Sequence, residues 1–406
     1  MTAKRHTQGT HRIVAPEETR ARLRPLLLPL GITRVANITG LDCIGVPVVA
    51  VYRPNSRSLS VAQGKGFTPV AAEVSGVMEA LEMHHAENVE RPLLHGSHAQ
   101  LGYAHRLVDP ECLPASSASR WHADLKLLWI EGVDLLSQEA CWVPYELVHT
   151  DFTLPLPAGS GCFPMSSNGL ASGNHLWEAV SHGICEVVER DAATLMSLMP
   201  EAEREARRLD PASVDDATCR ELLARFEAAG IRSVLFDMTT DVGIPAFRAV
   251  IMDAELEPER PLAPSTGTGC HPTRAVALAR ALTEAAQSRL TVIAGSRDDL
   301  PRARYADATD LKALDERRER LLRGEARRAF RDVSEFEADD VEADVLWLSE
   351  RLASVGIARI IVVDLTKPEF GVPVARVLVP GLEAGRHLPG WLPGPRASAL
   401  LARQAA

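Results

Sequence analysis

Three stretches of the sequence carry polar residues in the same order and at the same spacing. Each places polar side chains at positions i, i+4 and i+7 among mostly apolar or small neighbours. The three sets are Ser75, Glu79 and Glu82; Asn174, Glu178 and Ser181; and Arg280, Glu284 and Gln287. At about 100° per residue, such positions form one narrow stripe of an α-helix, so each helix presents one polar row. The second stretch continues with Glu186, Glu189 and Arg190.

The chemistry of these rows follows from their apolar surroundings. Carboxylates at the border of a core are costly unless a cation faces them. Clusters of carboxylate oxygens favour Mg²⁺, which in turn binds the phosphates of a nucleotide. A solvated helix face remains the alternative for any single row, because glutamate is common on exposed helices. Three rows of identical spacing favour a binding site.

Glycine-rich segments near the rows are further candidates for ligand contact. Lys65 lies between Gly64 and Gly66, where backbone N–H groups and an ammonium could approach a phosphate, although a plain turn is the alternative. The segment Ser166–Asn174 precedes the second row, and Ser172 or Asn174 could cap the helix that follows. The residues 267–269 are expected to form a tight turn into the third helix.

The elements that carry the rows can be predicted from periodicity. Apolar residues recur every three or four positions over 69–86, 174–196 and 272–293, which predicts three helices. A fourth, highly charged stretch over 310–331 has one apolar stripe and is expected to be an exposed surface helix.

A degenerate repeat occurs three times, over 26–54, 222–253 and 351–381. Each copy has a helical end, a glycine, an apolar run, a polar turn, Gly-(Val/Ile)-Pro and a second apolar run. The first glycine suits the end of a helix, and the runs rich in Val and Ile suit strands. We therefore predict an α/β fold of repeated helix-strand-strand units, with the carboxylate-bearing helices at its centre.

Composition excludes several classes of protein. The chain has 406 residues, with 44 Lys and Arg against 54 Asp and Glu, so its net charge of −10 argues against a nucleic-acid-binding surface. No apolar run approaches the roughly 18 to 20 residues that span a bilayer, and the first residues do not form a secretory signal. The seven cysteines include no C-x-x-C pair. A cytoplasmic protein without membrane contact is expected.

Long segments of the chain resemble the YcaO family. They include GLDCIGVPVVAVYRPNSRSLSVAQGKG, SGVMEALEMHHAE, PYELVHTDF, SSNGLASGNHLWEAVSHGICEVVERDA and GTGCHPTRAVALARALTEAAQSRLTVIAGSRDD. The resemblance spans about residues 30–380. It implies an ATP-dependent enzyme that phosphorylates the oxygen of a peptide backbone amide, after which a nucleophile replaces that oxygen. A side chain as nucleophile gives an azoline, a sulfide equivalent a thioamide, and a backbone amine an amidine.

The resemblance also implies roles for the polar rows, with ATP and Mg²⁺ as cofactors. The residues implied to serve the metal ions are Glu79, Glu82, Glu178, Glu186 and Glu189. Those implied to contact the nucleotide or to order the carboxylates are Lys65, Ser75, Asn174, Ser181, Arg190, Arg280, Glu284 and Gln287. Arg190 and Arg280 would also neutralise charge during phosphoryl transfer. Ser181 departs from family members that carry an acid there.

One departure from the family and one closer similarity within it bear on the product. Azoline-forming members typically end in Pro-x-Pro-x-Pro, whereas this sequence ends LLARQAA with Pro393 and Pro395 well before the end. The segment around Lys65 and the first row looks most similar to members that form thioamides with a TfuA partner. Thioamidation is therefore the first expectation, and azoline or amidine formation is the alternative. Two alternatives from other classes of protein are a non-catalytic scaffold that recruits a peptide and a metal hydrolase that uses no ATP.

The expected organisation has three parts: a flexible N-terminal arm over 1–25, a catalytic domain over 26–385, and a tail containing Pro and Gly over 386–406. The partners implied are a precursor peptide or protein substrate, a sulfur donor, a TfuA-like protein and a second copy in a homodimer.

Overall fold

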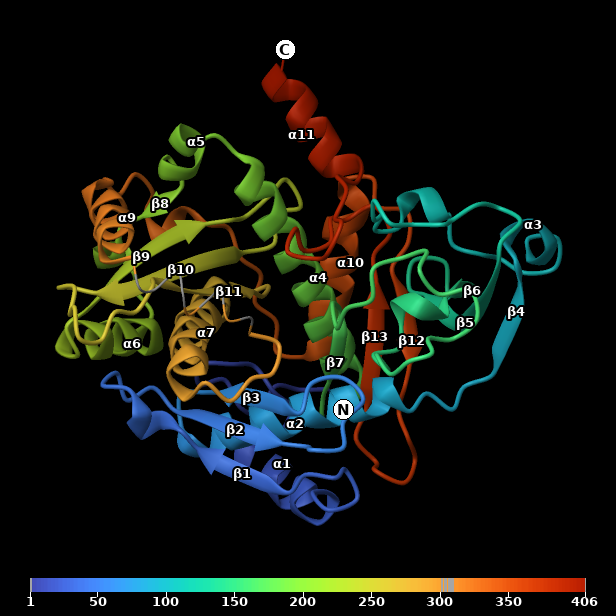
Figure 1. The fold of residues 1–406 in the computed structure, drawn as a ribbon, viewed down its shortest axis with the longest axis horizontal. Coiled ribbons are helices and arrows are strands. Elements are labelled where there is room, and N and C mark those ends of the chain that lie inside the picture. The colour runs from blue at the N-terminus through green and yellow to red at the C-terminus, as the bar shows by residue number, and fades with distance from the viewer. Residues whose placement is uncertain (1, 301, 303–304, 306–309, 406) are drawn as a thin grey trace.

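Three antiparallel sheets surround a central helix in the computed structural model, which describes residues 2–300, 302, 305 and 310–405. Figure 1 shows the central helix α4 (Leu176–Leu198) between a four-stranded sheet on the left and a six-stranded sheet on the right. The three-stranded sheet lies below both. The mixed α/β architecture expected from the sequence is confirmed.

The three-stranded sheet is formed by the N-terminal part of the chain, in the order β1-β2-β3. Its strands are β1 (Arg34–Asn37), β2 (Val48–Tyr52) and β3 (Val61–Lys65). Helix α1 (Pro16–Leu23) precedes it, and helix α2 (Pro69–Glu87) packs along β2 and β3.

The four-stranded sheet has the order β11-β10-β9-β8. Its strands are β8 (Arg208–Leu209), β9 (Ile231–Asp237), β10 (Ala246–Asp253) and β11 (Ser265–Cys270). Helix α7 (Arg274–Ala294) packs on β10 and β11, and α6 (Ala217–Ala228) packs on β9 and α7. The shorter α5 (Glu201–Glu205) and the charged α9 (Leu311–Arg323) lie at this end of the molecule (Figure 1).

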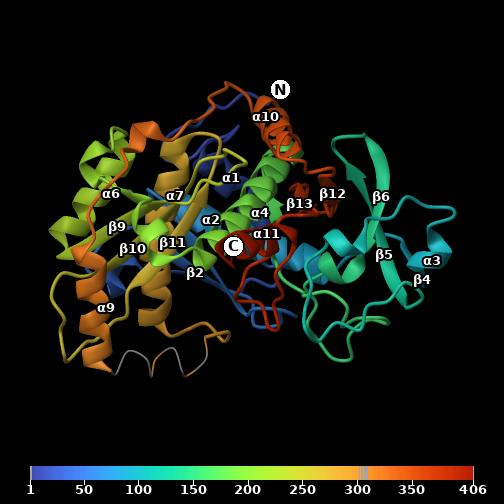
Figure 2. The ribbon, with the colours of Figure 1, turned by 90° about the horizontal axis from the view of Figure 1, so that it is seen from above.

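The six-stranded sheet has the order β4-β5-β12-β13-β7, with β6 paired to β5. Its strands are β4 (Leu93–Ser97), β5 (Lys126–Asp134), β6 (Glu139–Pro144), β7 (Leu170–Ser172), β12 (Ile361–Asp364) and β13 (Val374–Leu378). Helix α4 packs on β7 and β13 and is backed by α10 (Val341–Ser354). Figure 2 shows β4, β5 and β6 with α3 (His98–Leu101) at one end of the molecule.

The predicted repeat is confirmed as three β-hairpins, one in each sheet: β1–β2, β9–β10 and β12–β13. The two glycines of every copy have positive φ, as in Gly230 (+72°) and Gly243 (+73°). A side chain is disfavoured in this left-handed region, so glycine ends each helix and shapes each turn.

The structure extends the repeat by a third strand and a carboxylate helix. Strand β3 pairs with β2 and leads into α2, and β11 pairs with β10 and leads into α7. The third unit is split along the chain, because β7 and α4 come long before the hairpin β12–β13 to which β7 pairs. Each unit therefore consists of a hairpin, an inner strand and one polar helix.

The predicted helices over 69–86, 174–196 and 272–293 are confirmed to within two residues at each end. The charged helix is shorter than expected, because it ends at Arg323 before Gly324. The expected turn over 267–269 is wrong, since these residues lie within strand β11. Helix α4 is capped by His175, whose Nδ1 accepts from the N–H of Trp177, rather than by Ser172 or Asn174.

Both termini contain regular structure that the sequence interpretation missed. The expected arm over 1–25 includes α1, and the expected irregular tail over 386–406 includes α11 (Pro395–Ala405). Arg396 of α11 forms ion pairs with Asp191 and Asp241. Arg396 thus compensates the buried charge of Asp191 where α11 packs on α4.

Among the described residues, no helix is long and apolar enough to cross a bilayer. The seven cysteines are unbonded to one another.

Close packing of helix on strand depends on glycine in the inner strands. A Cβ at Gly267 of β11 would lie 2.2 Å from the carbonyl oxygen of Ala281 and 2.2 Å from the nitrogen of Ala285, both in α7. Gly64 of β3 has the same relation to α2, with 2.0 Å to the carbonyl oxygen of Ala72. Backbone atoms cannot yield as flexible side chains do, so these contacts set the distance between each polar helix and its sheet.

Replacing Gly267 by alanine should therefore force α7 away from β11. We expect a loss of about 3 kcal/mol in the free energy of unfolding, at the upper end of the cost of overpacking. Gly40→Ala is the matched control, because a Cβ at Gly40 meets no atom within 4 Å. Urea denaturation of both variants measures the difference, and equal midpoints would contradict the packing argument.

Candidate functional site

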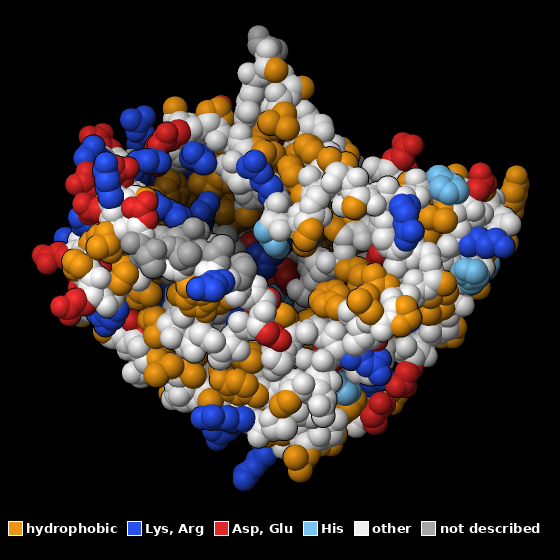
Figure 3. Space-filling view, in the orientation of Figure 1, with side chains coloured by type: hydrophobic (Ala, Val, Ile, Leu, Met, Phe, Trp, Pro, Cys, Tyr) orange, Lys and Arg blue, Asp and Glu red, His pale blue; other side chains and the backbone are white. Residues whose placement is uncertain are grey.

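A cleft of about 600 Å³ lies where α2, α4 and α7 face one another. Figure 3 shows a hollow near the centre of this face, with acidic and basic side chains inside it. The structure brings together in its wall every predicted site residue except Ser181: Lys65, Ser75, Glu79, Glu82, Asn174, Glu178, Glu186, Glu189, Arg190, Arg280, Glu284 and Gln287. Ser181 lines a separate cavity of about 10 Å³ behind α4.

The row on α2 is held by the inner strand of the neighbouring unit. Ser172 of β7 donates two hydrogen bonds to one oxygen of Glu82, from its N–H (2.8 Å) and its Oγ (2.6 Å). Burial raises the pKa of Glu82 to about 8 in spite of these bonds. Burial also raises the pKa of Glu79 against the opposing charges of Arg297 and Lys65. These carboxylates are thus short of compensating positive charge.

The row on α4 contains the most deeply buried acids. Glu178 is 2 % exposed and accepts one backbone N–H on each oxygen, from Ile13 (2.5 Å) and Asn174 (2.7 Å). Glu189 is 3 % exposed and accepts from the Oγ1 of Thr268 (2.6 Å). Burial raises the pKa of Glu186 to about 7, although Arg190 lies nearby.

Arg190 lies beside two of these acids without tight pairing. Its guanidinium is 3.5 Å from Glu189 and 3.8 Å from Glu186, and a third of its side chain is exposed. Distances of this length leave its N–H groups free to contact a further anion in the cleft.

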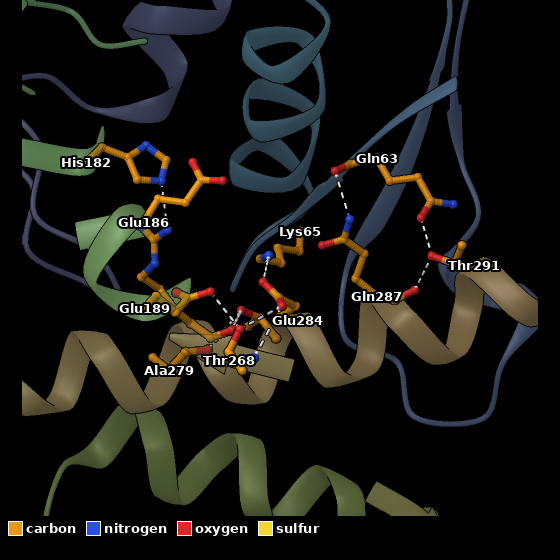
Figure 4. Close-up of polar contacts among 12 residues, drawn as sticks. Gln63, Lys65, His182, Glu186, Glu189, Thr268, Ala279, Glu284, Gln287 and Thr291 are labelled. Atoms are coloured by element: carbon orange, nitrogen blue, oxygen red, sulfur yellow. Dashed lines mark hydrogen bonds and ion pairs between the residues drawn. The ribbon is translucent and has the colours of Figure 1, made fainter. Parts of the chain in front are cut away.

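The row on α7 is tied to the first sheet. Lys65 Nζ lies 2.7 Å from Glu284 Oε2, and the N–H of Thr268 donates to Glu284 Oε1 at 3.2 Å. Burial works against ionisation of Glu284, but Lys65 and Arg190 outweigh it and lower its pKa to about 2. Figure 4 shows Lys65 and Thr268 beside this carboxylate, with Glu189 hydrogen-bonded to the same Thr268.

Several polar atoms in the cleft wall lack a partner among the described residues. Arg280 donates from Nη2 to Nε2 of His182 (2.7 Å), but its Nε has no acceptor. Gln287 donates to the carbonyl oxygen of Gln63 (3.0 Å), but its own Oε1 has no donor. Buried polar atoms of this kind indicate that a polar ligand or water completes the site.

Three donors connect the units in a ring. Ser172 on the inner strand β7 binds Glu82 on α2, Lys65 on β3 binds Glu284 on α7, and Thr268 on β11 binds Glu189 on α4. Each inner strand therefore supplies a donor to a carboxylate on the helix of a different unit.

The sequence interpretation missed the donors that hold the acids. Thr268 and Ser172 were regarded as a turn residue and a cap, and Gln63, His182 and Arg12 were not singled out as site residues, although all but Thr268 line the cleft. Lys65 and Thr268 each lie beside glycines in equivalent inner strands, and this shared pattern could have identified Thr268 as a site residue. No comparable sequence pattern indicated that residues 2–14 pack against the cleft.

The donor set fits a metal-bound nucleotide. Within the described residues, no three His, Cys, Asp or Glu side chains converge to hold an ion by themselves. Mg²⁺ commonly takes only one or two protein carboxylates and completes its shell with phosphate oxygens and water. Acids distributed around a cleft, with unpartnered polar atoms and raised carboxyl pKa values, match that mode of binding.

Relatives share most of the length of this chain. A protein of Rhizobium leguminosarum bv. trifolii, described as an uncharacterized protein in the tfuA 3' region, is 41% identical over 381 residues, covering 92% of this chain and 88% of its own. An uncharacterized protein of Methanothermobacter thermautotrophicus is 35% identical, covering 91% of this chain and 94% of its own.

Solved structures share the fold. YcaO from Methanopyrus kandleri, bound with AMPPCP and Mg²⁺, has a TM-score of 0.74 and 26% identity, with 94% of this chain and 95% of that chain covered. A heterocyclase in complex with substrate and cofactor has a TM-score of 0.77 and 24% identity. The match covers 94% of this chain and about half (54%) of the heterocyclase.

Residues 63–383 match the family described as YcaO cyclodehydratase, ATP- and Mg²⁺-binding. This range includes all three polar rows and the donors Lys65, Ser172 and Thr268 that hold the acids. The chain belongs to the YcaO family, whose members are ATP-dependent enzymes that bind ATP and Mg²⁺.

Proposed function

We propose that this chain catalyses ATP-dependent thioamidation of a peptide backbone. The observation that supports the activation step is the cleft, in which three polar helices surround a space large enough for a nucleotide. The relative in the tfuA 3' region supports sulfur as the incoming atom, because the sequence also resembles members that act with a TfuA partner.

When bound, ATP and Mg²⁺ would supply a phosphoryl group to the amide oxygen. Hydrosulfide would then form the carbon–sulfur bond as the carbon–oxygen bond breaks. Phosphate would leave with the hydrosulfide proton, and the amide N–H proton would be retained. The residues of this chain would position the reacting groups and neutralise the charge of the phosphoryl group. Glu79, Glu82, Glu178, Glu186 and Glu189 would hold the metal ions. Arg190 and Arg280 offer N–H groups that are free to contact phosphoryl oxygens. Lys65, which is paired with Glu284, adds a further positive charge to the cleft.

The proposed role of the remaining polar residues is to orient the nucleotide. Ser75 of α2, Gln287 of α7 and Asn174, just before α4, line the cleft. The unpartnered Oε1 of Gln287 can accept a hydrogen bond. Ser181 is a poor candidate for direct contact, because it faces the small cavity behind α4.

Glu189→Gln or Glu79→Gln should reduce ATP hydrolysis at least about 100-fold, as expected when a charge that supports phosphoryl transfer is removed. The amide is isosteric with the carboxylate, so the folded state should persist. Glu221→Gln is the matched control, since the Glu221 side chain is half exposed on α6 and, among the described residues, forms an ion pair only with Arg225. Phosphate release measured for the three variants tests the assignment; unchanged turnover in Glu189→Gln would refute it.

The product identifies the reaction. Protein, ATP, sulfide, a TfuA-like partner and a precursor peptide should together yield a peptide that is heavier by the exchange of one oxygen for one sulfur. Intact-mass spectrometry with ³⁴S-labelled sulfide reports this exchange. A peptide lighter by one water would instead establish azoline formation, and an unmodified peptide would favour a recruiting role.

A further inference from the structure

Residues 2–14, here called the N-terminal strap, form one side of the cleft. The residues of the strap that line the cleft include His6, Gln8, Gly9, Thr10 and Arg12. The strap has no apolar side chain larger than alanine before Ile13. Burial of apolar surface therefore cannot order it, and its position depends on specific polar contacts.

One end of the strap is attached to the start of α10. The N–H of Lys4 donates to the carbonyl oxygen of Asp339 (2.8 Å), and the N–H of Val341 donates to that of Thr2 (3.0 Å). The Nζ of Lys4 lies 2.8 Å from the carboxylate of Asp344, and both side chains are only 2 % exposed. The strap is thus joined to α10 by a short strand-like pairing and one buried ion pair.

The other end of the strap reaches the polar rows. The N–H of Ile13 binds Glu178, and Arg12 lies among the charges of Glu178, Glu82 and Arg280. The small cavity behind α4 is lined by both Arg12 and Asp344. The attachment at Lys4 and the contact with Glu178 therefore face the same space.

A buried ion pair is a poor source of net stability, because desolvation of both ions offsets their attraction. The two ions must nevertheless stay paired, because an unpaired charge in the interior costs a large amount of free energy. In the part of the strap before Ile13, which has no apolar anchor, such a pair specifies one register of the chain. This explains why a Lys–Asp pair, rather than an apolar contact, lies at the start of the strap.

We propose that the Lys4–Asp344 pair is a positioning latch for the nucleotide site. It fixes the strap so that Ile13 orients Glu178 and Arg12 remains beside Glu178 and Glu82 when a metal-bound nucleotide enters. The proposal rests on nucleotide binding in this cleft, which is the first half of the proposed function, and is independent of the product formed.

The test compares Lys4→Met with wild type in the full chain, using Mg²⁺ and a non-hydrolysable ATP analogue. We expect the dissociation constant and the KM for ATP to rise about tenfold, as for loss of a residue that orients a ligand-binding group, while kcat stays within about twofold. Lys4→Arg should restore most of the affinity. Lys367→Met is the matched control, because Lys367 is a buried lysine paired with Glu90 outside the cleft.

Unchanged nucleotide affinity in Lys4→Met, or an equal loss in Lys367→Met, would overturn the latch. Trypsin cleavage after Arg5 and Arg12 should be faster in Lys4→Met without nucleotide and slower when the analogue is bound. Cleavage at the wild-type rate would show that the pair does not order the strap. If the wild type formed an azoline, thioamidation would be refuted. The comparisons of nucleotide affinity and trypsin cleavage would still test the latch, because they do not depend on the product.

Discussion

Compensation of buried carboxylates is the constraint on which the site depends. Six glutamates line one cleft, and burial raises the pKa of three of them. The ring formed by Ser172, Lys65 and Thr268 satisfies one acid on each polar helix from the inner strand of another unit. No unit can complete its own row, so the three sheets must assemble before the acids are held. The divalent cations that accompany a bound nucleotide would supply the positive charge that these acids still lack.

Geometry explains why these acids share one cleft. Glycines at Gly64 and Gly267 allow α2 and α7 to lie directly on their inner strands, so donors on those strands reach acids across the cleft. Bulkier residues would separate helix from strand and lengthen every one of these contacts. The same glycines flank Lys65 and Thr268, which couples the packing of the fold to the chemistry of the site.

Periodicity predicted much of this arrangement, because helix rows and hairpin repeats are local properties of the chain. The helices with Glu79, Glu178 and Glu284 and the paired glycines of each repeat followed from spacing alone. What spacing could not reveal is contact between distant segments: Thr268 with Glu189, Ile13 with Glu178, and Lys4 with Asp344. The strap was misread as an arm because its order comes from polar contacts with α4 and α10, not from its own composition. Ser181 follows the same period as the row but lines only the small adjoining cavity, whereas Glu178 lines both that cavity and the cleft.

The split third unit has a consequence for how the protein is made. Strand β7 and α4 leave the ribosome long before β13, yet Ser172 pairs with Val374 and α4 packs on Val377. Until then α4 carries an uncovered apolar face that includes Val180, Ile184 and Val187. Contacts of such sequence separation make folding slow and leave intermediates prone to aggregation. The central acidic helix therefore reaches its final environment only after β12 and β13 have been synthesised.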